Sequence, residues 1–200
     1  MPSTPNSFMT SLASLLNLAL TVYMWLVIIR AVISWVNPNP YNPVVQFLGR
    51  ITDPALNQIR RIFPLTLGGL DFSPVILILL LVFANDFVVF SLNWLAHGRP
   101  ASGLAPIFII SLIRLTQGVL FAFLVIIIVR AVLSWISPDP YNPLVRLVYG
   151  ATEPVLYPLR RRLPLVHRGY DLAPLALGLA VYLAIYVLGW AQGAVSLALP

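Results

Sequence analysis

Long apolar stretches alternate with short polar segments along the 200 residues of this chain. Apolar residues dominate four stretches. Three of them cover about positions 12–36, 72–96 and 172–197. The remaining one ends at 136 and is purely apolar from about Gly118. A helix crosses the hydrocarbon core of a bilayer with roughly 20 such residues, so each stretch predicts one membrane-spanning helix. The composition agrees, because 60% of the residues are hydrophobic and only 9% are charged, against about 25% charged in soluble domains.

The connectors at 37–71 and 137–171 follow a different pattern, in which apolar and polar side chains alternate over short segments. Asn42-Pro43 is typical of a helix cap followed by proline in the first turn, and Asp53-Pro54 repeats this signal. We therefore expect two short amphipathic helices in the first connector, both lying in the membrane interface, and the same in the second. Asp71 is then expected to cap the following span.

The chain contains an internal repeat with a constant offset of 100 residues. The sequence R-A-V-I-S-W-V-N-P-N-P-Y-N-P at 30–43 returns as R-A-V-L-S-W-I-S-P-D-P-Y-N-P at 130–143. A fixed offset indicates a duplicated module, which we place at 12–96 and 112–197, joined by an outer link at 97–111. The predicted fold is an all-α membrane protein of two tandem helical hairpins, with four transmembrane helices and amphipathic interfacial helices in the connectors.

Charge predicts the orientation of these hairpins. The chain has 12 basic residues, all arginine, and a formal net charge of +6. Three arginines lie in connector 37–71 and five in connector 137–171, whereas the outer link has one and the tails have none. Because basic residues accumulate on the cytoplasmic side, both connectors are expected in the cytoplasm and both termini outside. The arginines are therefore expected to set the membrane topology of the chain and not to bind nucleic acid.

Arg30 and Arg130 are the first candidate site residues, because each is a cation inside the predicted end of a span. One interpretation is an arginine that extends to the interface. The other is an ion pair with an acid of the connector, with Asp71 and Asp171 as first candidates and Asp53 and Glu153 as further ones. The repeated motif residues that would accompany this structural or ion-path cluster are Ser34, Trp35, Asn42, Ser134, Trp135 and Asn142.

Asp86 is the carboxylate deepest within a predicted span, and Asn85 stands beside it. An ionisable residue inside the membrane suggests a functional site, although a role in helix packing is the alternative. Arg114 lies at a similar depth, some 15 Å from the outer face at 1.5 Å per residue. We expect Asp86 and Arg114 to meet, or to share a polar cluster with Asn85 and Gln117.

The remaining polar groups predict contacts with the bilayer rather than chemistry. Trp35 and Trp135 are expected in the aromatic belt of the interface. The chain has no cysteine, and His97 and His167 lack neighbours with metal-ligand spacing, so no metal, cofactor or catalytic function is expected. Anionic lipid of the cytoplasmic face, or alternatively a docked protein partner, is expected at the basic residues Arg60, Arg61, Arg160, Arg161 and Arg162.

The doubled motif at 30–43 and 130–143 resembles that of the YggT family of bacterial inner-membrane proteins. The resemblance implies a location in the inner (plasma) membrane and a role in osmotic or extracytoplasmic stress, exerted through ion flux. Related plastid proteins are linked to cytochrome assembly and nucleoid distribution, which implies the alternative of a non-transporting scaffold or assembly factor. The partners implied are the lipid bilayer and either a homo-oligomer or other membrane proteins. The first prediction is the stress role with an effect on ion flux, and the scaffold is the alternative, which the almost wholly apolar first and fourth spans favour.

Overall fold

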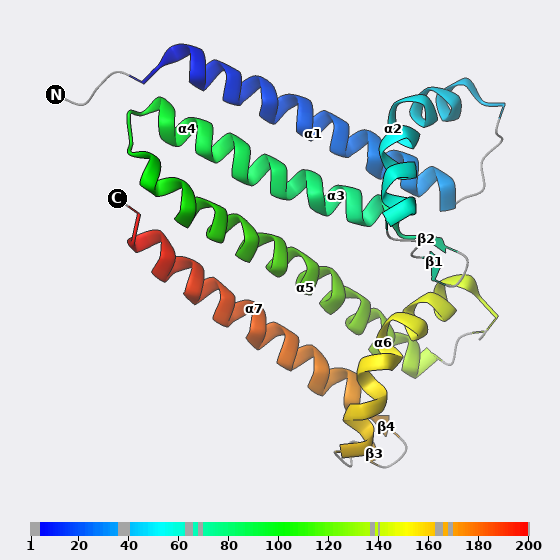
Figure 1. Ribbon diagram of the computed structural model, residues 1–200. Coiled ribbons are helices and arrows are strands. Elements are labelled where there is room, and N and C mark those ends of the chain that lie inside the picture. Colours follow the sequence, from blue (N-terminus) through cyan, green and yellow to red (C-terminus); the bar gives the residue numbers. More distant parts are fainter. Residues whose placement is uncertain are drawn as a thin grey trace. The chain divides into compact units, whose positions relative to one another are not determined.

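The computed structural model describes most of the chain as helix (Figure 1). The described residues are 5–35, 41–62, 66–67, 70–136, 139, 141–162, 166–167 and 170–199.

The first repeat runs α1 (Ser7–Trp35), α2 (Pro43–Ile62), β1 (Thr66–Leu67), β2 (Leu70–Asp71), α3 (Ser73–Ala84), η1 (Asn85–Val89) and α4 (Phe90–Ala96). After η2 (Ala101–Gly103), the second repeat runs α5 (Leu104–Ile136), α6 (Pro143–Arg162), β3 (Val166–His167), β4 (Tyr170–Asp171) and α7 (Ala173–Leu197). The strands form two antiparallel pairs, in which Thr66 faces Asp71 and Val166 faces Asp171. The sequence did not predict these short pairs.

Four helical segments are long and apolar enough to cross a membrane: Ser7–Ser34, Ser73–Ala96, Ala101–Ser134 and Ala173–Leu197. The predicted all-α membrane fold with four spans is therefore confirmed. The third helix begins at Leu104, well before the purely apolar stretch that starts near Gly118. Pro106 is compatible with this early start, because a proline in the first turn removes a donor that has no helical partner.

Asn6 defines the beginning of α1. Its side-chain oxygen accepts a hydrogen bond from the Phe8 backbone N–H at 3.1 Å, which satisfies one free donor of the first turn. The Asn6 backbone N–H donates to the Ala96 carbonyl at 2.8 Å and so joins the start of α1 to the end of α4. In Figure 1, α1 runs alongside α3 and α4.

The amphipathic part of each connector is one bent helix rather than two. α2 continues through Pro54, and α6 continues through Pro154 and Pro158, so the predicted break at Asp53-Pro54 is wrong. The bend of α2 is visible in Figure 1. A proline inside a helix removes one backbone hydrogen bond and kinks the helix. The Thr52 hydroxyl adds to the bend, because it donates to the Leu48 carbonyl four residues earlier at 2.8 Å.

The core of the first repeat lies where α2 covers the ends of its two spans. Val27 of α1, Leu56 and Ile59 of α2, and Leu77 of α3 form one buried cluster. Of the corresponding positions in the second repeat, Ile127 and Leu156 are buried, at 1% and 0% exposure, and Leu159 and Leu177 are half-buried. The amphipathic helix therefore buries its apolar side on its own hairpin in both repeats.

Contacts divide the chain into two compact units, one of residues 1–65, 72–115 and 192–200 and the other of residues 66–71 and 116–191. Most of the first repeat belongs to the first unit and most of the second repeat to the second unit. Each unit contains its own arginine of the repeated motif.

Candidate functional site

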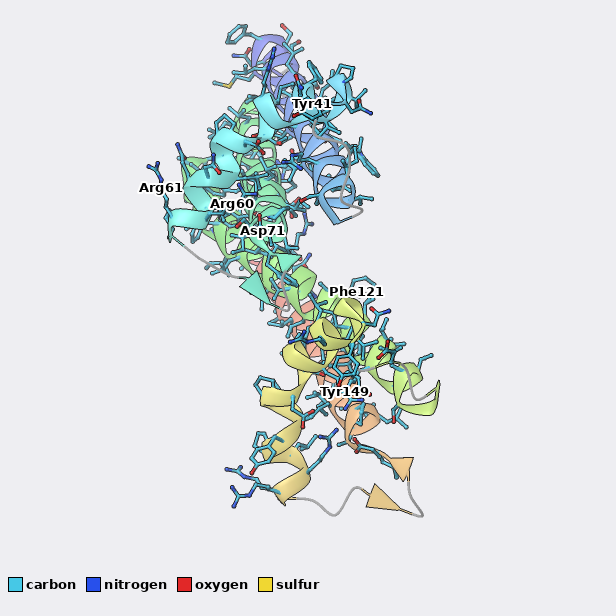
Figure 2. The ribbon with its side chains drawn as sticks, turned by 90° about the vertical axis from the view of Figure 1, so that its right-hand side faces the viewer. Tyr41, Arg60, Arg61, Asp71, Phe121 and Tyr149 are labelled. Atoms are coloured by element: carbon cyan, nitrogen blue, oxygen red, sulfur yellow. The ribbon has the colours of Figure 1, made fainter. Side chains whose placement is uncertain are left out.

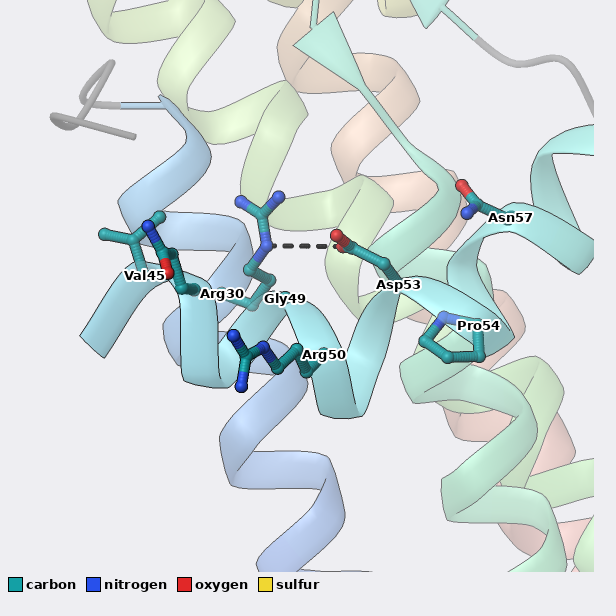
Figure 3. Close-up of a pocket in the computed structure, with 8 residues that line it drawn as sticks. Arg30, Val45, Gly49, Arg50, Asp53, Pro54 and Asn57 are labelled. Atoms are coloured by element: carbon teal, nitrogen blue, oxygen red, sulfur yellow. Dashed lines mark ion pairs between the residues drawn. The ribbon is translucent and has the colours of Figure 1, made fainter. Parts of the chain in front are cut away.

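Arg30 lies near the end of α1, where α2 crosses it. Its Nε is 3.4 Å from Oδ1 of Asp53, and the two side chains are 19% and 38% exposed (Figure 3). The prediction that Arg30 contacts an acid is confirmed, but Asp71, the first candidate, is not the partner found. Because α2 does not break at Pro54, Asp53 is held within the helix that covers Arg30, whereas Asp71 follows later on β2.

Arg130 occupies the matching position in the second repeat and is more deeply buried. Its Nη2 is 3.8 Å from Oε2 of Glu153, and its side chain is 8% exposed. The guanidinium also lies 3.5 Å from the centroid of the Tyr149 ring, close enough for a cation–π interaction. The partner found is again the acid within the amphipathic helix, so the preference for Asp171 is also wrong.

Asp171 pairs with Arg160 instead, and this pair extends the network. Arg160 donates from Nε to Asp171 at 3.0 Å and from Nη1 to Glu153 at 2.7 Å. Burial lowers the pKa of Arg160, but its hydrogen bond to Asp171 and the charges of both carboxylates outweigh this effect, so the pKa is raised. Oδ1 of Asp171 also accepts from the Ala173 backbone N–H at 3.0 Å, which confirms its predicted role at the start of a span.

The network joins α5, α6 and the start of α7 through alternating charges. Such charge-assisted hydrogen bonds are stronger than neutral ones. Arg160 is therefore part of the internal structure rather than a freely exposed basic residue, whereas Arg161 and Arg162 are exposed. At the end of α2, Arg60 donates to Asn57 at 2.7 Å, and Figure 2 shows Arg61 extending away from the ribbon.

Asp86 and Arg114 do meet, as predicted. Oδ2 of Asp86 is 3.5 Å from Nη1 of Arg114, and their side chains are 33% and 44% exposed. Asp86 lies in η1, a π-helical turn within the second span. One-turn π segments inside α-helices often occur at functional sites.

Asn17 is a site residue that the sequence analysis missed. Nδ2 of Asn85 donates to Oδ1 of Asn17 at 3.0 Å, which connects the π-helical turn to α1. Gln117, the residue 100 positions after Asn17, donates to the Ile185 carbonyl at 3.3 Å, so it is not part of the predicted cluster. Ile185 is in turn 100 positions after Asn85, and the repeat offset was the signal that would have identified this contact.

The other motif residues have more local roles. Oδ1 of Asn42 accepts from the Val44 backbone N–H at 2.9 Å, which confirms the predicted helix cap before α2. The Asn142 carbonyl accepts from the Arg146 backbone N–H in the first turn of α6. Ser34 is exposed and Ser134 is half-buried. The side chains of Trp35 and Trp135 lie outside the described residues, so their placement in the aromatic belt stays a prediction.

Comparisons with known proteins agree with the duplication. A family model described as CCB3/YggT matches residues 9–92 and again residues 109–192, so each match includes one copy of the motif. An uncharacterised protein of Pseudomonas aeruginosa is 34% identical over 164 residues, which cover 82% of this chain and 80% of that protein. The uncharacterised protein YggT of Escherichia coli K12 is 27% identical over 174 residues, which cover 87% of each.

A shorter relative matches part of the chain. The uncharacterised protein ycf19 of Guillardia theta is 39% identical over 77 residues, which cover 38% of this chain but 82% of that protein. That length is close to one repeat. No solved structure matches the chain.

Proposed function

The chain belongs to the CCB3/YggT family, and from that premise we propose that it is a non-transporting scaffold or assembly factor for another membrane protein. Its proposed location is the bacterial inner membrane, with both connectors in the cytoplasm and both termini outside, because the arginines concentrate in the connectors. Osmotic or extracytoplasmic stress is the condition in which we expect it to act.

The observation that supports this proposal is the exposed ion pair of Asp86 and Arg114. Asp86 is 13 residues from Ser73 and 10 from Ala96, so it lies near the middle of its span. Charged groups inside a membrane normally face other protein or water, because lipid solvates them poorly. A span of another protein with polar side chains would cover this pair and be held by it.

The surroundings of the pair favour a fixed binding surface. The rings of Phe83 and Phe87 both make edge-on contacts with the ring of Phe108, at centroid distances of 5.7 and 5.4 Å. These contacts fix α5 against the second span, one from α3 just before the π-helical turn and one from within it. A surface of this kind loses little side-chain freedom on binding, which favours affinity.

A photo-crosslinking residue in place of Phe90 tests the proposal in the native membrane. Phe90 is 44% exposed and lies about one turn after Asp86. We expect a discrete adduct that mass spectrometry identifies as another membrane protein, and we expect Asp86→Asn with Arg114→Gln to abolish it. The matched control is the same residue at Trp190, 100 positions after Phe90 and 75% exposed, which should react with lipid.

Two results would contradict the scaffold. Crosslinks to lipid alone at Phe90 would show that nothing covers the ion pair. An adduct with a second copy of the chain would assign the surface to self-association instead.

Ion flux is the second candidate function, and one arrangement favours it. Asn17 of α1, Asn85 and Asp86 of η1, and Arg114 of α5 bring polar groups from three spans to one region. Transport sites are built from polar groups near the membrane midplane. Flux measured on purified protein in liposomes separates the two functions, because flux that Asp86→Asn abolishes would replace the scaffold with transport.

A further inference from the structure

A pocket of about 520 Å³ lies beside Arg30 at the end of α1. Its volume falls within the roughly 300–1,000 Å³ that is usual for sites binding small molecules. Most of its wall comes from α2, and its lining residues are Arg30, Val45, Gln46, Gly49, Arg50, Asp53, Pro54 and Asn57. Figure 3 shows both guanidinium groups and the Asp53 carboxylate in this pocket.

The pocket has more positive than negative charge. Arg30 and Arg50 supply two cations, and Asp53 is the one acid among the lining residues. Asp53 faces Nε of Arg30, and in Figure 3 the two terminal nitrogens of Arg30 point away from that carboxylate. Among the residues that the structure describes, Arg50 has no ion-pair partner and is exposed. An anion would therefore find the donors of Arg50 and the terminal nitrogens of Arg30, with one carboxylate against two guanidinium groups.

The second repeat has a different residue at five of the eight lining positions, and two of these differences bear directly on the arginine. Tyr149 takes the place of Gly49, and its ring covers the Arg130 guanidinium at 3.5 Å. Gly150 takes the place of Arg50, which removes the cation at that position, while the exposed Arg146 takes the place of Gln46. The same backbone thus carries an arginine covered by the chain in one repeat and an arginine beside an open pocket in the other.

We propose that the pocket of the first repeat binds a phosphate group, supplied either by an anionic lipid headgroup or by a small soluble phosphate. Guanidinium groups bind phosphate oxygens through paired N–H donors, and two arginines on adjacent helices suit a phosphate with several free oxygens. The proposal does not depend on the scaffold function, because the pocket and the Asp86–Arg114 pair share no residue.

Exchanging residues between the repeats tests this site in the full-length protein. Gly49→Tyr with Arg50→Gly gives the first repeat the side chains that stand at these two positions in the second repeat. Lipid binding is measured by native mass spectrometry from nanodiscs containing phosphatidylglycerol, and phosphate binding by equilibrium dialysis against inorganic phosphate. We expect the affinity of this variant to fall by about tenfold at least, because it loses a charge-assisted contact. Retention of lipid alone identifies the headgroup as the ligand, and phosphate binding identifies the soluble anion.

Three further variants keep the test clear. A Cβ at Gly49 would lie 3.0 Å from Oδ2 of Asp53, so Arg50→Gln alone tests the charge without crowding and should also bind about tenfold more weakly. Arg61→Gln removes an exposed arginine of the same helix outside the pocket and should bind as the unaltered protein does. Tyr149→Gly with Gly150→Arg should create a second binding site.

The proposal is overturned if Arg61→Gln weakens binding as much as Arg50→Gln does. That result would assign the anion to the general positive charge of α2. It is also overturned if the unaltered protein retains neither phosphatidylglycerol nor inorganic phosphate.

Discussion

Replacement of Glu153 by glutamine isolates the contribution of the ion pair to the stability of the second repeat. Arg130 is buried between the Tyr149 ring and Glu153. Glutamine keeps the size of the side chain but removes its charge. The substitution therefore leaves the arginine inside the unit with the aromatic ring and a neutral amide as its partners.

The geometry gives the magnitude of the loss. At 3.8 Å and an effective dielectric constant of about 20, the attraction is roughly 4 kcal/mol. Glu153 is 43% exposed, so water screens part of this attraction. Arg160 still has its hydrogen bond to Asp171 when the charge of Glu153 is removed. We expect Glu153→Gln to lower the free energy of unfolding by about 2–3 kcal/mol, below the usual loss for a fully buried pair.

Asp53→Asn in the first repeat provides an internal comparison. The distance there is shorter, at 3.4 Å, but Arg30 is 19% exposed against 8% for Arg130. Water can reach Arg30 more easily once its partner is neutral, so we expect a smaller loss, of about 1–2 kcal/mol. Burial rather than distance is thus expected to decide which repeat depends more on its ion pair.

The measurement is equilibrium unfolding of the purified protein in bilayers, for the single variants and for Arg130→Gln with Glu153→Gln. Because the two residues are in contact, the double variant should lose less than the sum of the single losses, with a coupling of about 1–3 kcal/mol. Arg162→Gln is the control, since Arg162 is exposed. Additive losses, or a loss for Glu153→Gln below about 0.5 kcal/mol, would refute the reasoning.

Three other predictions concern different parts of the chain. Gly103→Ala should lower the free energy of unfolding in bilayers by about 1–3 kcal/mol, because a Cβ there would lie 2.5 Å from the Trp94 ring; an unchanged value would contradict this packing. Asp86→Asn should lower the yield of folded protein by leaving Arg114 unpaired, and adding Arg114→Gln should restore it, as measured by gel filtration. Reporter fusions at residue 100 and at the C-terminus should both report the outside, and a cytoplasmic signal at either would contradict the topology.

The sequence predicted the spans and the repeats well because both depend on local composition. Runs of apolar residues define a transmembrane helix by length alone. The ion-pair partners were harder to predict, because they depend on how α2 continues after Asp53. Asp71 was preferred because it begins the span that follows Arg30, and a short hairpin was expected to bring those two ends together. In the structure the helix bends and continues, so the Asp53 carboxylate stays within reach of the Arg30 guanidinium.

The π-helical turn at Asn85–Val89 has no comparable signal in the sequence. It inserts extra backbone into a span that is mostly apolar on both sides of Asn85 and Asp86. Its position depends on contacts from other helices, namely Asn17 on α1 and Arg114 on α5. Side-chain pairing between distant segments is therefore the part that sequence pattern alone did not provide, except where the repeat offset exposes it.

The two repeats also show how duplication separates stability from binding. Both keep the arginine, the acid of the amphipathic helix and the buried threonine, whose hydroxyl bonds the carbonyl four residues earlier in each copy. In the second copy Arg160 pairs with Asp171, and the Tyr149 ring covers Arg130. A cation enclosed in this way contributes to the fold but offers nothing to a ligand. The first copy has Gly49 at that position, so its arginine borders open space, and the proposed ligand is expected there and not in the second repeat.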